Sequence, residues 1–226
     1  MSILFIDTNF GLSTATLVDQ EKNCFNSSNN SKLRQSETIA SVVKETLNKS
    51  NKSIDDISCL MVTNGPGNFT SIRVGISFAL GLAKGINKPV YSLSSLEFLS
   101  FFDDKKLLKR KEIITLLPSR GDEFFIQTFC GKGKNLTEIE KINKTDIEDK
   151  FSPDKFIISK SSLHNNEYGL SNKYEIFDRT FEELSIIIAS EILSKSDKVN
   201  KFKKINYFSE PSAEKISSSW YMKKKN

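Results

Sequence analysis

Histidine is almost absent from this sequence: a single one, His164, occurs among 226 residues. A metal site that uses two histidines is therefore excluded, and neither H-E-x-x-H nor H-x-x-x-H occurs. A Ser-His-Asp triad would have to use His164, which lies in the polar, turn-like segment SSLHNN, without the glycine pattern of a nucleophile elbow. The sequence thus argues against both histidine-based metalloenzymes and serine hydrolases.

Cysteines are few and dispersed, and long apolar runs are missing. Cys24, Cys59 and Cys130 form no C-x-x-C pair, so we expect reduced, buried thiols rather than disulfides or a thiolate metal site. No run approaches the roughly 18 to 20 apolar residues that cross a bilayer. The first residues carry neither a basic region nor a small-residue cleavage site. We therefore expect a cytoplasmic protein without membrane contact.

Acidic residues are scarce near the end of the chain. The whole sequence carries a net charge of +5, from 33 basic and 28 acidic residues. Residues 198–226 hold eight lysines and two acids, an excess of +6, so the remaining residues sum to about zero. A lysine-rich end can contact a phosphate backbone, but it is also typical of a solubilising tail, and the charge alone leaves both interpretations open.

Apolar periodicity predicts alternating strands and helices. Strands are predicted over 3–6, 13–18, 57–62, 90–93, 113–117, 123–129, 156–159 and 205–208, and helices over 36–50, 69–84, 95–101 and 181–193, with a polar hairpin tip or loop at 26–32. This order predicts an α/β protein with mixed sheets flanked by helices. A charged linker near 105–111 suggests two lobes, 1–104 and 105–208. Whether 209–226 packs back on the first lobe is left open.

Nucleotide chemistry is the better candidate for a site. Asp7 ends a buried first strand and is followed by Thr8 and a tight turn, as in actin-like and sugar-kinase-like ATPases, where such residues hold metal-bridged phosphate. Those turns need glycine so that backbone N–H groups can approach phosphate, whereas here glycine comes only at Gly11. A degenerate remnant of a phosphate turn is favoured over an intact one.

The most distinctive segment is GPGNFTSIRVG, at residues 65–75. Gly65 and Gly67 form a turn between a strand end and a helix N-terminus, whose N–H groups can bind an anion. The segment can equally be a stiff turn in which Asn68 or Thr70 caps the helix and Phe69 fills the core. It matches neither a Walker A loop nor a Rossmann glycine motif.

This segment resembles the G-P-G-S-F-T-G-[LV]-R-[IV]-G signature of the TsaB (YeaZ-type) family of tRNA threonylcarbamoyladenosine biosynthesis. Further matches are ILFIDTN at 3–9, QSE at 35–37, VYSLSSL at 90–96, Arg120-Gly121 and YFSEPSA at 207–213. The chain departs from the family at Gln35, Asn68 and Ser71, where the family has His, Ser and Gly.

The resemblance implies a two-lobed fold of the actin, sugar-kinase and Hsp70 type. It also implies a non-catalytic dimerisation subunit without its own cofactor, a paralogue of the catalytic subunit TsaD, whose metal site uses an H-x-x-x-H motif. The pair, joined by a small ATPase, TsaE, transfers threonylcarbamoyl to N6 of the adenosine 3′ to the tRNA anticodon, so tRNA is contacted through the complex. ATP or ADP at the subunit interface is left open.

In this family the subunits pair through the first two helices, and both predicted helices carry wide apolar stripes. Contact residues are predicted at Gln35, Ile39, Val43, Phe69, Arg73, Ile76 and Leu80. The same apolar positions are also what plain core residues would show. An exposed helix pair is expected to self-associate as a homodimer when its partner is absent.

Three alternative functions are kept. One is an ATPase or kinase of the same superfamily, which predicts tight nucleotide binding by the isolated chain. The second is a peptidase, which the single histidine disfavours. The third is a tRNA-binding module that depends on the basic end of the chain.

Overall fold

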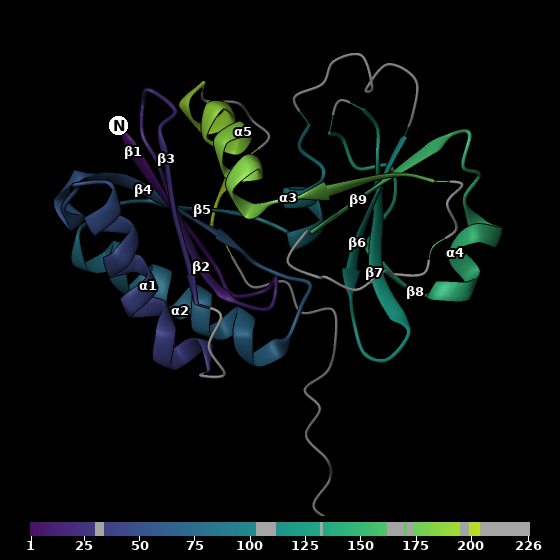
Figure 1. Cartoon of the computed structure of the whole chain (residues 1–226), viewed down its shortest axis with the longest axis horizontal. Helices are drawn as coiled ribbons and strands as arrows, with labels where there is room; N and C mark the ends of the chain where they lie inside the picture. The colour runs from purple at the N-terminus through teal and green to yellow at the C-terminus, as the bar shows by residue number, and fades with distance from the viewer. Residues whose placement is uncertain are drawn as a thin grey trace, which may run out of the picture.

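Two mixed β-sheets, each with its own helices, lie side by side in the computed structural model of the chain (Figure 1). The structure describes residues 1–29, 34–102, 112–131, 133–161, 170, 174–194 and 199–203. Every helix among these residues is too short or too polar to span a bilayer. The α/β fold with mixed sheets that the sequence predicts is confirmed.

The first sheet has six strands in the order β11-β5-β4-β1-β2-β3. Its strands are β1 (Ser2–Asp7), β2 (Ser13–Val18), β3 (Cys24–Asn29), β4 (Ile57–Thr63), β5 (Val90–Leu93) and β11 (Asn200–Lys201). Strand β1 pairs antiparallel with β2 and parallel with β4, and β4 pairs parallel with β5. The loop predicted from Asn26 is wrong as far as Asn29, because these polar residues continue the edge strand β3 in register with β2.

Helices cover both faces of this sheet, and the alternation of side chains along β1 explains why. Leu4 and Ile6 pack with α1 (Gln35–Lys49) and α2 (Phe69–Gly85). Ile3 and Phe5 point to the opposite face and pack with α3 (Ser95–Leu99) and α5 (Phe181–Leu193). A strand that is covered on both faces needs a continuous apolar run, which is what the first strand has.

The helix boundaries follow from their caps. Helix α2 begins where predicted, because the Asn68 side chain accepts hydrogen bonds from the backbone N–H groups of Thr70 and Ser71, at 3.0 and 3.1 Å. Helix α1 was predicted to begin at a Ser36 cap, but its cap is Arg34. The Glu37 carboxylate accepts from the Arg34 backbone N–H at 3.2 Å and closes the first turn there.

The second sheet has five strands in the order β10-β9-β6-β7-β8. Its elements are β6 (Glu112–Pro118), β7 (Glu123–Phe129), β8 (Glu140–Asn143), α4 (Lys144–Lys150), β9 (Phe156–Ser161) and β10 (Glu175–Arg179). The prediction covered β6, β7 and β9 and missed β8, α4 and β10. These three elements are short and only partly buried, so they carry little apolar periodicity.

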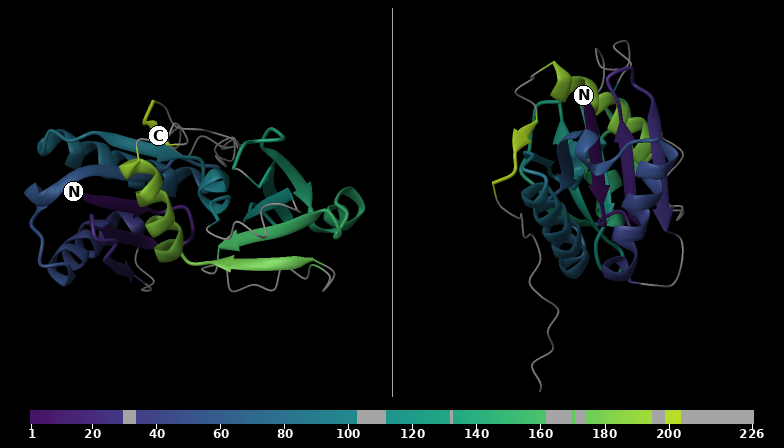
Figure 2. Two further views of the ribbon diagram at one scale, coloured as in Figure 1. Left: turned by 90° about the horizontal axis from the view of Figure 1, so that it is seen from above. Right: turned by 90° about the vertical axis from the view of Figure 1, so that its left-hand side faces the viewer.

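After the second sheet the chain returns to the first. Helix α5 packs on β2 and β3 (Figure 1), and β11 adds to the edge of β5 (Figure 2). The predicted second lobe, 105–208, includes both segments, whereas in the structure α5 packs on strands of the first sheet and β11 pairs with β5. The predicted linker at 105–111, the strand at 205–208, His164 and the segment 209–226 lie outside the described residues.

An apolar cluster joins the two sheets. The rings of Phe98 and Phe181 stack with their centroids 4.8 Å apart, and Phe10 lies 5.8 Å from Phe98. The same cluster includes side chains of the second sheet, among them Leu117 and Phe129. The junction between the lobes is therefore continuous hydrophobic core, and Phe10, which directly follows the Asp7 turn, is part of it.

Candidate functional site

The turn after β1 is closed by its own carboxylate. Asp7 is fully buried, and its Oδ2 accepts hydrogen bonds from the backbone N–H groups of Asn9 at 3.0 Å and Phe10 at 2.9 Å. Its Oδ1 accepts a short hydrogen bond from the Thr63 hydroxyl at the end of β4. The backbone donors that a phosphate-binding turn would present to a ligand are thus directed at Asp7.

Thr8 and Asn9 tie this turn to the first turn of α2 and to the end of β4. The Thr8 hydroxyl donates to the Ser71 carbonyl at 2.6 Å, and the Asn9 amide donates to the Thr63 hydroxyl at 2.9 Å. A Cβ at Gly67 would lie 3.0 Å from the Asn9 Oδ1, so the loop approaches the turn closely. The Gly65 carbonyl accepts from the Ser95 N–H at 2.7 Å and holds α3 against the same loop.

The structure therefore brings together the four candidates for a nucleotide site, Asp7, Thr8, Gly65 and Gly67. Thr8 and the Asp7 carboxylate hydrogen-bond within the chain, as does the Gly65 carbonyl. No glycine stands between the acid and Phe10, whose ring enters the core between the lobes. This geometry favours a structural role, in which these residues hold β1, β4 and α2 together, over a phosphate-binding site.

Asp7 also gives a pH-dependent prediction. Burial raises the pKa of Asp7 to about 6, although hydrogen bonds from Thr63, Phe10 and Asn9 oppose the rise. Because the folded-state pKa lies above the ordinary value of 3.8, the folded protein holds this proton more tightly than the unfolded chain. The stability that the protonated carboxyl provides is present below the unfolded pKa and is lost as the pH rises through about 6.

We expect Asp7→Asn to flatten this dependence, because the amide oxygen still accepts from the turn but cannot ionise. The free energy of unfolding of the wild type should fall by about 2 kcal/mol more than that of the variant between pH 4.5 and pH 7.5. Urea unfolding at both pH values measures this difference. Equal pH dependence in the two proteins would show that Asp7 does not titrate in this range.

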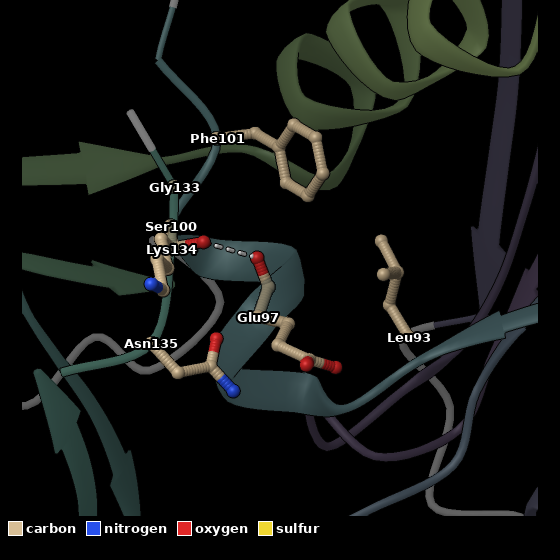
Figure 3. A pocket seen from close by; sticks show the side chains of 7 residues that line it. All are labelled: Leu93, Glu97, Ser100, Phe101, Gly133, Lys134 and Asn135. Carbon is tan, nitrogen blue, oxygen red and sulfur yellow. Dashed lines mark hydrogen bonds between the residues drawn. The ribbon is translucent and has the colours of Figure 1, made fainter. Parts of the chain in front are cut away.

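A second feature, which the sequence did not indicate, is a pocket between the lobes (Figure 3). It has a volume of about 270 Å³ and is lined by Leu93, Glu97, Ser100, Phe101, Gly133, Lys134 and Asn135. The Glu97 carboxylate in this pocket already has a structural role. One of its oxygens accepts a hydrogen bond from the Ser94 N–H at 2.8 Å and so caps α3. Helix α3 and the segment after β7 meet here only in three dimensions, which is why no sequence motif marks the pocket.

Three of the predicted contact residues are core residues. Ile39, Val43 and Ile76 are 2%, 4% and 1% exposed and pack between the helix pair and the first sheet. Their burial disagrees with the prediction that they are partner contacts, because the chain's own core already covers them. Gln35 is half-buried and its amide donates to the Gly11 carbonyl at 3.3 Å, so it contacts the Asp7 turn.

The outer face of α2 holds the remaining predicted contact residues. Leu80 is 37% exposed, and the Arg73 guanidinium lies over the ring of Phe69, 3.5 Å from its centroid. We call the row Phe69, Arg73, Ser77 and Leu80 the α2 stripe, since its members recur every three or four residues along one side of the helix. Among the residues predicted to contact a partner, those of the α2 stripe are the ones that share an outer helix face.

Within the described part of the chain, no three His, Cys, Asp or Glu side chains are grouped as metal ligands. The three cysteines are free, with Cys59 buried and Cys24 and Cys130 half-buried. Burial raises the pKa of the Cys24 thiol to about 12 and that of Cys59 to about 11, which favours the protonated thiol of both at neutral pH.

Comparisons with known proteins give a consistent picture. A family model described as TsaD, tRNA N6-adenosine threonylcarbamoyltransferase, matches residues 29–117. The tRNA threonylcarbamoyladenosine biosynthesis protein TsaB of Buchnera aphidicola is 27% identical over 153 residues, 66% of this chain and 71% of that protein. The tRNA N6-adenosine threonylcarbamoyltransferase of Clostridium beijerinckii is 31% identical over 112 residues, 48% of this chain but only 31% of its own length.

Among solved structures, YeaZ from Pseudomonas aeruginosa superposes with a TM-score of 0.65 at 13% identity, covering 85% of this chain and 92% of YeaZ. A second Pseudomonas aeruginosa structure, described as similar to peptidase YeaZ, also has a TM-score of 0.65, at 14% identity over the same shares. The chain thus has the same overall fold as these YeaZ structures, with two mixed sheets flanked by helices. In sequence it is similar to TsaB, and the GPGNFTSIRVG segment carries its resemblance to the TsaB (YeaZ-type) family.

Proposed function

We propose that this chain acts in tRNA threonylcarbamoyladenosine biosynthesis as a non-catalytic subunit that pairs with a TsaD-type catalytic subunit. The observation that carries the pairing is the α2 stripe, in which Leu80 stays exposed on the same helix that buries Ile72, Ile76, Ala79 and Ala83 in the core. The proposed complex includes a TsaE-type ATPase and takes tRNA as its substrate in the cytoplasm.

The non-catalytic role is supported by the chemistry of the candidate site. Asp7, the acid that an ATPase of this fold would use, is bonded to its own turn and to Thr63. The chain's single histidine cannot supply a two-histidine metal site. A subunit that contributes only a binding surface needs neither a free catalytic acid nor a metal site.

The surface around the α2 stripe suits a packed helix partner. Ser77 and Gly81 are exposed next to Leu80, and nothing lies within 4 Å of a Cβ added at Gly81. Small residues beside one large apolar residue let a second helix approach closely while the apolar side chain enters its groove. In the isolated chain the same surface would pair with a second copy.

We expect Leu80→Asp to weaken binding to the catalytic subunit by about tenfold or more, because a carboxylate would then be buried in an apolar contact. The fold should be retained, since Leu80 is exposed in the free chain. Isothermal titration with the purified catalytic subunit measures the effect. Leu136→Asp is the matched control, because Leu136 is 48% exposed on the other lobe. Equal affinity of both variants and the wild type would exclude the α2 stripe from the interface.

The function itself is tested by reconstitution. Purified catalytic subunit, ATPase subunit, threonylcarbamoyl-adenylate and unmodified tRNA are combined with and without this chain, and the modified nucleoside is quantified. The proposal requires product that depends on the chain. Product that forms equally without it, together with tight ATP binding by the isolated chain, would favour an ATPase or kinase instead.

A further inference from the structure

Four lysines gather at one corner of the first sheet. Lys84 lies in the last turn of α2, Lys88 in the loop that leads to β5, and Lys201 and Lys203 in and after β11. We call them the lysine corner. Three of the four are exposed, and Lys88 is half-buried.

The sheet topology brings these lysines together from separate parts of the sequence. Strand β11 runs antiparallel to β5, with Lys201 opposite Tyr91, and the Phe202 N–H donates to the Val90 carbonyl at 2.8 Å. This direction carries Lys203 to the end of the sheet where β5 begins. The Lys88 N–H donates to the Ala83 carbonyl at 2.9 Å and holds the loop against the end of α2. Figure 2 shows β11, in yellow, at the edge of the first sheet.

No acid belongs to the segments that build this corner. Residues 69–93 and 199–203 contain Arg73 and the four lysines but neither Asp nor Glu. The neighbouring acids Asp55 and Asp56 precede β4, which lies on the far side of β5 from β11. Among the described residues, the recorded ion pairs involve none of the four lysines. Within the part of the chain that the structure describes, the corner is therefore a cluster of positive charge with no acid in its own segments.

We propose that the lysine corner contacts the phosphate backbone of the tRNA substrate, an inference that rests on the proposed function. Lysine ammonium groups bind phosphates as flexible point charges, and each contact releases condensed counterions from the nucleic acid. Folded RNA is read largely through shape and backbone, which suits a cluster of lysines without base-reading side chains. The sequence that follows also carries a positive net charge, since residues 204–226 contain five lysines and two acids.

The test uses the full chain and a fluorescent, unmodified tRNA transcript, with affinity measured by anisotropy at several salt concentrations. The test variant combines Lys88→Glu, Lys201→Glu and Lys203→Glu. The control combines Lys134→Glu, Lys144→Glu and Lys155→Glu on the second lobe, which changes the net charge equally. We expect the test variant to bind about tenfold or more weakly and to lose about 2 from the slope of log affinity against log salt. The control should change affinity by less than about twofold.

Several results would overturn the inference. If both triple variants bound tRNA equally weakly, the change in net charge alone would explain the loss of affinity. Unchanged binding by the test variant, with loss only after Lys215, Lys223, Lys224 and Lys225 are changed to Gln, would assign the contact to the end of the chain. Binding to anionic phosphatidylglycerol vesicles but not to tRNA would assign the corner to a lipid surface. Because this assay involves no catalysis, its failure is distinguishable from failure of the reconstitution.

Discussion

Gly75→Ala is expected to lower the free energy of unfolding by about 2–4 kcal/mol, although alanine is the better helix former. An added Cβ at Gly75 would lie 2.4 Å from the Thr8 Oγ1, which donates to the Ser71 carbonyl at 2.6 Å. The helix cannot withdraw, because Ile72 and Ile76 on the same side are packed in the core. The substitution should therefore break the hydrogen bond that fastens the first turn of the chain to α2.

Two further variants make this prediction specific. Gly81 lies in the same helix with nothing within 4 Å of an added Cβ, so Gly81→Ala should stabilise by about 0.5–1 kcal/mol. Adding Thr8→Ala to Gly75→Ala removes the atom that clashes, so the double variant should be more stable than Gly75→Ala alone. Urea unfolding of all four proteins gives these free energies. The predicted clash would be contradicted if Gly75→Ala left the free energy of unfolding unchanged, or if the double variant were less stable than Gly75→Ala.

Phe98→Ala is expected to cost about 3–5 kcal/mol, the usual loss when a large buried side chain leaves a cavity. Phe98 is fully buried, stacks on Phe181 and lies 5.8 Å from the Phe10 ring. Because the cluster also contains side chains of the second sheet, the loss should destabilise both lobes. Hydrogen exchange should show faster exchange in β1 and in β6 alike.

Phe78→Ala is the control, because it removes the same phenyl ring from a position that is only half-buried. Phe78 is a half-buried residue of α2 that packs only at the margin of the other core cluster, so we expect a loss below about 1.5 kcal/mol. Denaturant unfolding compares the two variants, and exchange compares the lobes. If Phe98→Ala accelerated exchange in one sheet alone, the two lobes would have to be independent folding units.

The sequence predicted best the elements whose pattern is local and strong. The buried strand at 57–62, the helix at 181–193 and the Asn68 cap carry their signals within a few neighbouring residues. The polar edge strand β3 and the short elements β8, α4 and β10 carry weak apolar periodicity, because they are partly exposed. Their conformation depends on pairing with distant strands, which local pattern does not encode.

The sequence predicted which residues come together at the Asp7 turn, but it did not predict the hydrogen bonds between them. Asp7, Thr8, Gly65 and Gly67 meet as expected, but the pairing of Asp7 with Thr63 is set by the register between β1 and β4. Apolar periodicity also cannot tell which apolar side chains of a helix face the core and which face solvent. That is why Ile39 and Leu80 looked alike in the sequence, whereas one is buried and the other exposed.

The return of the chain to the first sheet has a consequence during synthesis on the ribosome. Residues 2–99 make most of the first lobe, but α5 and β11 are translated only after the whole second sheet. At about 5–20 residues per second, the interval between residues 99 and 201 is about 5–20 seconds. Until then the edge of β5 and the face beneath α5 stay uncovered, as an open strand that neighbouring nascent chains can pair with. The first sheet of the nascent protein is therefore completed only when α5 and β11 have been translated.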